Sequence, residues 1–162
     1  MKKEKINCDK IILAGISVRT NNKNEMEPEK AKIGSLFENY FMKGLANQIP
    51  NRKDAGRTFS VYTDYETDEH GDYTYFMGEE MTEAAELPEG LETITIEAST
   101  YQKFTTAPGK IPDVIIGAWR QIWMMNDLDF EGKRAYKADF EVLDVKTLDP
   151  TNAVFDIFVG IQ

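Results

Sequence analysis

Two short segments of the chain place carboxylates in a strand-like pattern with aromatic residues. Residues 139–141 read Asp-Phe-Glu and residues 64–66 read Asp-Tyr-Glu, and each segment is followed by an aromatic run that ends in a glycine. In the later segment apolar side chains alternate with acids, which is the period of a strand with one buried face. We therefore expect Glu66 and Glu141 at matching places on the polar face of one sheet, as a negative floor near a pseudo-twofold axis.

A pair of glutamates beside aromatic rings supports two kinds of chemistry. Rings and a counter-charge bind organic cations, at about 0.5 to 2 kcal/mol per cation–π contact. Two glutamates in one groove can also act as general acid and base on a bound molecule. The alternative for each position is structural, a solvated strand carboxylate or a ring packed in the core. The aromatic candidates for the site are Tyr62 and Tyr75 on strands and Phe37, Trp119 and Trp123 on helices.

Other kinds of site find no support in the sequence. His70 is the single histidine and lies in an acidic turn, so a metal site would lack a second nitrogen ligand. Cys8 is the single cysteine, which excludes a disulfide within the chain and favours a reducing compartment. No glycine-rich phosphate loop, dinucleotide fingerprint or serine elbow is present. The prediction is no metal, no cofactor and no classical catalytic nucleophile.

The elements that would position these side chains follow one order twice. Residues 10–81 are predicted to form a strand, an amphipathic helix that ends before Pro50, and two further strands. Residues 91–161 are predicted to repeat this order, with residues 91–105 as one long strand. Two β-α-β-β units give an α+β fold, in which an antiparallel sheet carries both helices on one face. We expect a single domain over residues 1–162, with the opposite sheet face free to form a groove between the halves.

Composition limits the partners. The net charge of −9, from 28 acidic and 19 basic residues, repels phosphate backbones, and no basic stripe offsets it, so direct nucleic-acid binding is not expected. No stretch approaches the ~20 apolar residues of a membrane span, and the N-terminus lacks a signal-peptide pattern. These features predict a cytoplasmic protein without a membrane partner. They do not predict its oligomeric state.

The duplicated unit, with Trp119 and Trp123 on its second helix and residues 139–141 on the next strand, resembles the GyrI-like, or AraC-type effector-binding, domain family. The nearest resemblance is to the stand-alone, integron-associated branch, over roughly residues 10–161. It implies a hydrophobic groove with an acidic residue at its floor that recognises cationic, amphipathic molecules. The family's pocket glutamate carries over to Glu141 and its helix aromatics to Trp119 and Trp123, while Phe37 stands where relatives often have a tryptophan.

Three functions remain open at this point. The first is a drug- or effector-binding protein that acts as a sensor or a sequestering agent; in relatives the groove is the sensor of a transcription regulator, but 162 residues leave no room for a helix-turn-helix module. The second is a hydrolase that uses Glu66 and Glu141. The third is an acidic protein-interaction module of the gyrase-inhibitor type.

Overall fold

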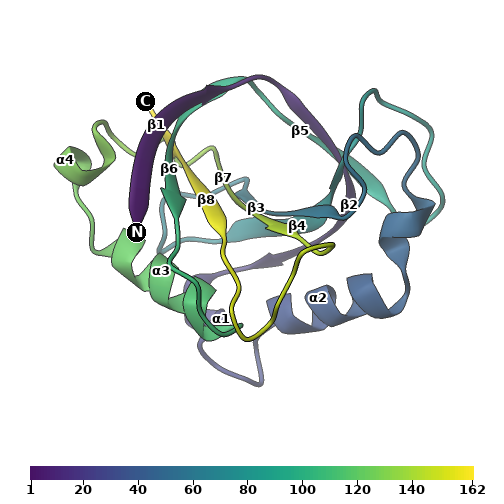
Figure 1. Ribbon diagram of the computed structural model, residues 1–162, viewed down its shortest axis with the longest axis horizontal. Coiled ribbons are helices and arrows are strands. Elements are labelled where there is room, and N and C mark those ends of the chain that lie inside the picture. The colour runs from purple at the N-terminus through teal and green to yellow at the C-terminus, as the bar shows by residue number, and fades with distance from the viewer.

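The computed structural model describes residues 1–162 and shows helices packed on one face of a strongly curved antiparallel sheet (Figure 1). The eight strands are β1 (Lys2–Cys8), β2 (Ile11–Thr20), β3 (Arg57–Thr63), β4 (Tyr73–Glu80), β5 (Glu92–Ile96), β6 (Ser99–Thr105), β7 (Ala138–Asp144) and β8 (Asp156–Ile161). The helices are α1 (Asn22–Glu25), α2 (Ile33–Met42), a 3-10 helix (Leu45–Gln48), α3 (Asp113–Trp123) and α4 (Asp127–Phe130). None of these helices has the length and apolar character needed to cross a membrane.

The predicted duplication of elements is present in the sheet. The order β2-α2-β3-β4 is followed later by β6-α3-β7-β8, and the strands are arranged as β1-β6-β8-β7-β3-β4-β2-β5. The two halves meet where β3 pairs with β7, and there Ser60 lies opposite Glu141. The α+β fold class with both long helices on one face is confirmed.

A long two-stranded ribbon connects the two ends of the sheet. Cys8 pairs with Ser99 and Ile11 pairs with Ile96, so β1 followed by β2 runs beside β6 and β5 in one continuous register. β2 also pairs with β4, and β6 also pairs with β8, so the ribbon closes the sheet on itself. Figure 1 shows this ribbon arching over the face opposite the helices. The prediction of one strand over residues 91–105 is wrong, because the chain passes from one half to the other between Ile96 and Ser99.

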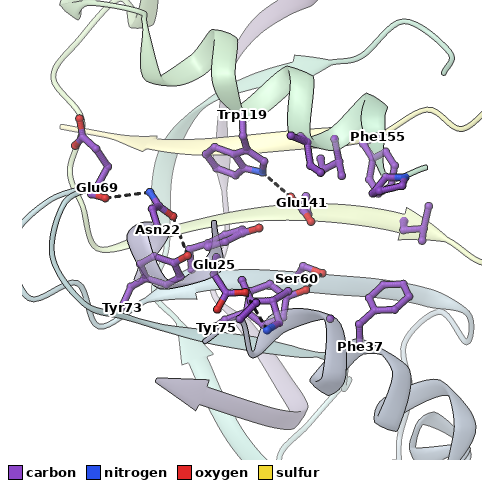
Figure 2. Close-up of a pocket in the computed structure, with 18 of the residues that line it drawn as sticks. Asn22, Glu25, Phe37, Ser60, Glu69, Tyr73, Tyr75, Trp119, Glu141 and Phe155 are labelled. Carbon is purple, nitrogen blue, oxygen red and sulfur yellow. Dashed lines mark hydrogen bonds between the residues drawn. The ribbon is translucent and has the colours of Figure 1, made fainter. Parts of the chain in front are cut away.

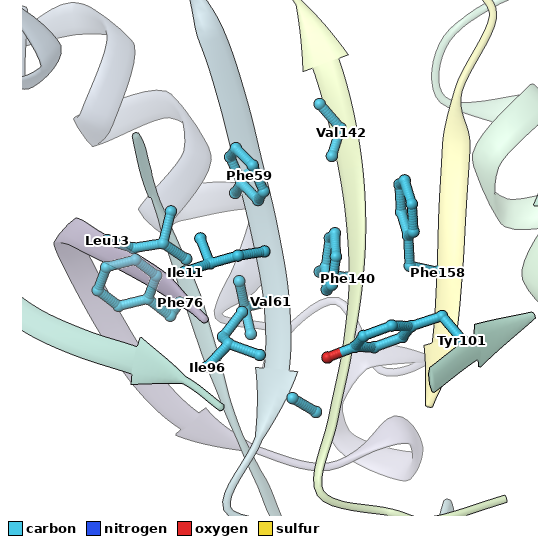
Figure 3. Close-up of a cluster of buried hydrophobic side chains, with 11 residues drawn as sticks. Ile11, Leu13, Phe59, Val61, Phe76, Ile96, Tyr101, Phe140, Val142 and Phe158 are labelled. Atoms are coloured by element: carbon cyan, nitrogen blue, oxygen red, sulfur yellow. The ribbon is translucent and has the colours of Figure 1, made fainter. Parts of the chain in front are cut away.

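The face under the ribbon is filled with hydrophobic side chains (Figure 3). Phe140 and Val142 of β7 point into this core, whereas Glu141 and Leu143 point towards the helices. The expectation of a groove on the sheet face opposite the helices is therefore wrong. Closure of the ribbon places a packed core there, with members Ile11, Leu13, Phe59, Val61, Phe76, Ile96, Tyr101, Ala138, Phe140, Val142 and Phe158.

Candidate functional site

A cavity of about 530 Å³ lies on the helix face of the sheet, between α2 and α3 (Figure 2). Its floor consists of side chains from the central strands, where the two halves meet, and its walls come from the two helices and nearby loops. The floor residues are Thr58, Ser60, Tyr62, Tyr73, Tyr75, Glu141 and Leu143. The helix residues are Ile33, Gly34 and Phe37 from α2 and Ile115, Ile116, Trp119 and Trp123 from α3.

Glu141 is the buried carboxylate of this floor, and only 8% of it is exposed. The indole Nε1 of Trp119 donates a hydrogen bond to its Oε2 over 2.7 Å. Burial raises the pKa of Glu141 to about 7, while the Trp119 indole and the Tyr62 hydroxyl act to lower it. A carboxyl group in this setting can accept either a proton or a bound cation near neutral pH.

Aromatic rings enclose the carboxylate. The ring of Tyr62 lies edge-on to three neighbours, with centroid distances of 5.1 Å to Trp119, 5.3 Å to Tyr75 and 5.5 Å to Tyr73. The Tyr75 hydroxyl donates to Ser60 Oγ over 2.9 Å, which fixes that ring on the floor. Edge-to-face contacts and hydrogen bonds hold the cluster in one arrangement, so a ligand would meet preformed aromatic faces.

Glu25 connects the cavity to the start of α2. Its carboxylate accepts hydrogen bonds from the Thr20 hydroxyl (2.6 Å) and from the backbone N–H groups of Lys32 (2.9 Å) and Ile33 (3.1 Å). The N-cap residue Lys32 makes no side-chain cap of its own. Glu25 therefore supplies the negative charge and the acceptors that the first turn of α2 requires.

A polar network forms one end of the cavity. Asn22 Nδ2 donates to the carbonyl oxygen of Glu69 over 3.0 Å, and Asn22 Oδ1 accepts from the Tyr73 hydroxyl over 2.8 Å. The carboxylate of Glu69 accepts a hydrogen bond from the Tyr136 hydroxyl. Asn22, Glu69 and Tyr73 all line the cavity, so this end presents oxygen and nitrogen atoms to a ligand.

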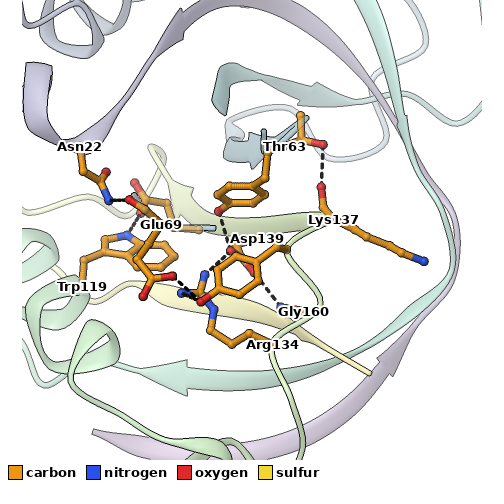
Figure 4. A network of polar contacts seen from close by, with 11 residues as sticks. Asn22, Thr63, Glu69, Trp119, Arg134, Lys137, Asp139 and Gly160 are labelled. Atoms are coloured by element: carbon orange, nitrogen blue, oxygen red, sulfur yellow. Dashed lines mark hydrogen bonds and ion pairs between the residues drawn. The ribbon is translucent and has the colours of Figure 1, made fainter. Parts of the chain in front are cut away.

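Beside this network lies a largely buried ion pair between Asp139 and Arg134, and Arg134 also lines the cavity (Figure 4). Asp139 accepts hydrogen bonds from Arg134 Nη2 (2.6 Å), the Tyr65 hydroxyl (2.6 Å) and the backbone N–H of Gly160 (2.8 Å). The guanidinium of Arg134 also lies over the ring of Tyr136, with its Cζ 4.3 Å from the centroid. Asp139 thus neutralises Arg134 and ties three separate segments together.

The structure brings together six of the seven side chains predicted for the site. The cavity is lined by Glu141, Trp119, Trp123, Phe37, Tyr62 and Tyr75. Their role in ligand binding stays a prediction.

Glu66 does not belong to this cavity, and the prediction of two paired carboxylates is wrong. Strand β3 ends at Thr63, and Asp64 has a φ of +49°, which turns the chain out of the sheet. Glu66 is exposed in the following loop, where its N–H donates to the carbonyl oxygen of Asp72 over 2.8 Å. The residue of β3 that faces Glu141 is Ser60.

Sequence reasoning missed Asn22, Glu25 and Glu69 as cavity residues. All three lie in polar segments that predict loops and turns, and the pattern carries no sign that the loops fold back over the sheet. Acidic residues are often found near the start of a helix. Glu25, however, is seven residues before the N-cap residue Lys32, and the usual capping patterns involve residues closer in sequence.

Comparisons with known proteins agree on a family. The family model described as Cass2, integron-associated effector binding protein, matches residues 6–161. YobU of Bacillus subtilis (strain 168), whose name describes a proposed transcriptional regulator, is 29% identical over 149 residues, which are 92% of this chain and 91% of YobU.

Two solved structures share the fold over the whole chain. An integron cassette protein from the mobile metagenome of Vibrio cholerae is 27% identical with a TM-score of 0.75, covering 99% of this chain and 95% of its own. The protein SAV2435, solved bound to tetraphenylphosphonium, is 16% identical with a TM-score of 0.78, covering 100% of this chain and 94% of its own.

Proposed function

The chain belongs to the integron-associated effector-binding protein family, and from its cavity we propose that it binds a cationic, amphipathic small molecule in the cytoplasm, as a sensor or a sequestering agent. The observation that carries this proposal is the buried Glu141 carboxylate at the floor of an aromatic cavity. Effector binding in general follows from the family. The cationic character of the ligand is inferred from the site.

The charge of the site favours a cation because Glu141 has no basic partner. Its hydrogen-bond donor is the neutral indole of Trp119, and no lysine or arginine lies within ion-pair distance of it. A buried and unpaired carboxylate is costly, so the group either takes up a proton or gains a counter-ion. The surrounding rings of Tyr62 and Trp119 attract the same positive charge through their quadrupoles. The tetraphenylphosphonium bound by SAV2435 is a ligand of this kind, which supports the choice of probe.

The hydrolase alternative loses its basis in the structure. It required Glu66 and Glu141 in one groove as general acid and base, but Glu66 lies outside the cavity in an exposed loop. The other carboxylates that line the cavity are those of Glu25 and Glu69, and each accepts hydrogen bonds from groups other than Glu141. We therefore propose binding without turnover.

The test compares a cation with a neutral molecule of nearly equal shape. Methyltriphenylphosphonium and triphenylphosphine oxide differ mainly in charge, and titration calorimetry gives both affinities. Glu141→Gln keeps the shape and the acceptor for Trp119 but removes the charge. We expect the phosphonium to lose roughly tenfold to a hundredfold in affinity, the range for a buried charged contact, while the oxide changes little.

Glu66→Gln is the matched control because it makes the same change of charge outside the cavity. It should leave both affinities unchanged. Equal losses for the two ligands in Glu141→Gln would show that Glu141 provides no charge selectivity, and the proposal would be abandoned. Melting curves of both variants exclude loss of the fold as the cause.

A further inference from the structure

The two ends of the cavity differ in chemistry, and Glu141 lies between them (Figure 2). Phe37 and Phe155 lie at one end, which is apolar. Asn22 and Glu69 lie at the other end. In this view Glu69 and Glu141 lie on opposite sides of the Trp119 ring. The carboxylates of Glu69 and Glu141 therefore lie at separate positions along the cavity.

The carboxylates near the polar end differ in how much of their negative charge is already balanced by hydrogen-bond donors or by a cation. Glu25 accepts three hydrogen bonds, two of them from the N-terminus of α2, whose dipole favours negative charge. Asp139 accepts three hydrogen bonds and forms an ion pair with Arg134. Neither group has a free charge to offer a ligand.

Glu69 is different. Its carboxylate accepts one hydrogen bond, from the neutral Tyr136 hydroxyl on its Oε2. Its nearest basic group is His70, whose Nε2 is 4.0 Å from Oε1 and whose side chain is 85% exposed. Glu69 itself is 26% exposed and lines the cavity. A carboxylate has about four acceptor positions, so Glu69 keeps both its charge and most of its hydrogen-bonding capacity.

We propose that Glu69 is the anchor of a second cation subsite, and that the protein prefers elongated dications over monocations. One positive group lies beside Glu141 within the aromatic rings, and a second, hydrogen-bond-donating group such as an amidinium pairs with Glu69. The aromatic part of the ligand, which joins its two positive groups, lies across the ring of Trp119. This inference rests on the proposed function, because it takes Glu141 as the first cation subsite.

An amidinium is the group that suits Glu69 best. Its N–H donors lie in a plane and form parallel hydrogen bonds with a carboxylate, which are stronger than bonds between neutral groups. The carbonyl oxygen of Glu69 and the side chain of Asn22 are already bonded to each other. The carboxylate of Glu69 is thus the charged acceptor that still has free lone pairs at this end of the cavity.

The experiment uses 4′,6-diamidino-2-phenylindole, which carries an amidinium at each end, and 6-amidino-2-phenylindole, which carries one. Fluorescence titration of the wild type should show the diamidine binding roughly five- to tenfold more tightly, as expected for a partly exposed charged contact. Glu69→Gln should abolish this preference and leave the affinity for the monoamidine within about twofold, because Glu69 then offers no counter-charge.

Glu66→Gln is again the control, since it removes the same charge from the same exposed loop without touching the cavity. It should keep the preference. A preference that survives in Glu69→Gln, or that falls equally in Glu66→Gln, would overturn the assignment of Glu69. Glu69→Ala gives a second reading if the glutamine variant melts early.

The failure of this inference is distinguishable from failure of the proposed function. If methyltriphenylphosphonium binds with the expected dependence on Glu141 but the diamidine has no advantage over the monoamidine, only the second subsite is wrong. If neither the phosphonium nor the amidines bind the wild type, the proposed function falls as well.

Discussion

Lowering the pH should weaken the binding of a permanent cation, through the protonation of Glu141. Burial raises the pKa of this carboxyl group to about 7 in the free protein. A phosphonium beside it favours the ionised form, so the bound protein has a lower pKa at this position. The ligand must therefore displace a proton at acidic pH, and at alkaline pH it meets a carboxylate that is already charged.

The size of the effect follows from the fraction of Glu141 that is ionised. With a pKa of about 7, roughly 90% is ionised at pH 8 and about 3% at pH 5.5. If the pKa in the complex lies below this window, the affinity for methyltriphenylphosphonium falls about thirtyfold from pH 8 to pH 5.5. At pH 6.5 binding should release about 0.8 proton.

Titration calorimetry measures both quantities. Affinities at several pH values give the profile, and repeated titrations in buffers of different ionisation enthalpy give the number of protons released. Glu141→Gln should bind more weakly at pH 8 and show a flat profile. His70 is the single histidine of the chain, so His70→Gln serves as the control and should keep the wild-type profile. A flat wild-type profile, or a slope that disappears with His70, would refute the assignment to Glu141.

Two further predictions concern the stability of the protein without ligand. The folded-state pKa of Glu141 is raised from 4.5 to about 7. The protonated carboxyl group therefore stabilises the fold by an amount on the order of 3 kcal/mol below pH 4.5, and this stabilisation is lost as the pH rises through 7. Glu141→Gln should therefore melt at a higher temperature than the wild type at pH 8, and the difference should be smaller at pH 5. Thermal melts in which the variant is less stable than the wild type at pH 8 would contradict this prediction. Gly78 faces Gly15 across β2 and β4, and a Cβ on Gly78 would come within 2.0 Å of the Ala14 carbonyl oxygen. Gly78→Ala should lower stability by at least about 2 kcal/mol in urea unfolding, whereas Gly117→Ala in α3, where a Cβ meets nothing within 4 Å, should raise it by up to about 1 kcal/mol.

The sequence carries enough information to orient β7. Alternation of acids and apolar residues placed Glu141 on one face and Phe140 on the other, and the structure agrees, because successive side chains of a strand point to opposite faces regardless of what covers them. The same alternation does not show what covers each face. The polar face of β7 is on the helix side of the sheet, where it forms part of the cavity floor, and the apolar face lies under the ribbon.

The error at Glu66 has a local cause. Residues 64–66 (Asp-Tyr-Glu) resemble residues 139–141 (Asp-Phe-Glu), but the earlier segment precedes an acidic turn that contains a glycine, and the backbone leaves the sheet at Asp64. Asp tolerates a positive φ better than most residues, and Asp64 adopts one where β3 ends. Similar sequences therefore adopt different backbone conformations in the two halves.

The break between β5 and β6 could not be located from residues 91–105 alone. Glu97 and Ala98 separate the two strands, and neither is a strong turn residue. The two strands differ in their partners: β5 pairs with β2 and β6 pairs with β8. These pairings join residues more than fifty positions apart, so the sequence pattern within residues 91–105 does not reveal them.

The position of the cavity follows from how each helix packs. α3 contributes Ala118, Trp119 and Ile122 to one hydrophobic cluster, and α2 contributes Leu36 and Tyr40 to another. Tyr62 is the residue that packs against both clusters. Each helix thus covers the strands of its own half, and the junction of β3 with β7 remains between them without a helix above it. The site exists at this junction because two helices that each bury one half leave the shared strands open, and the carboxylate that faces the opening is Glu141.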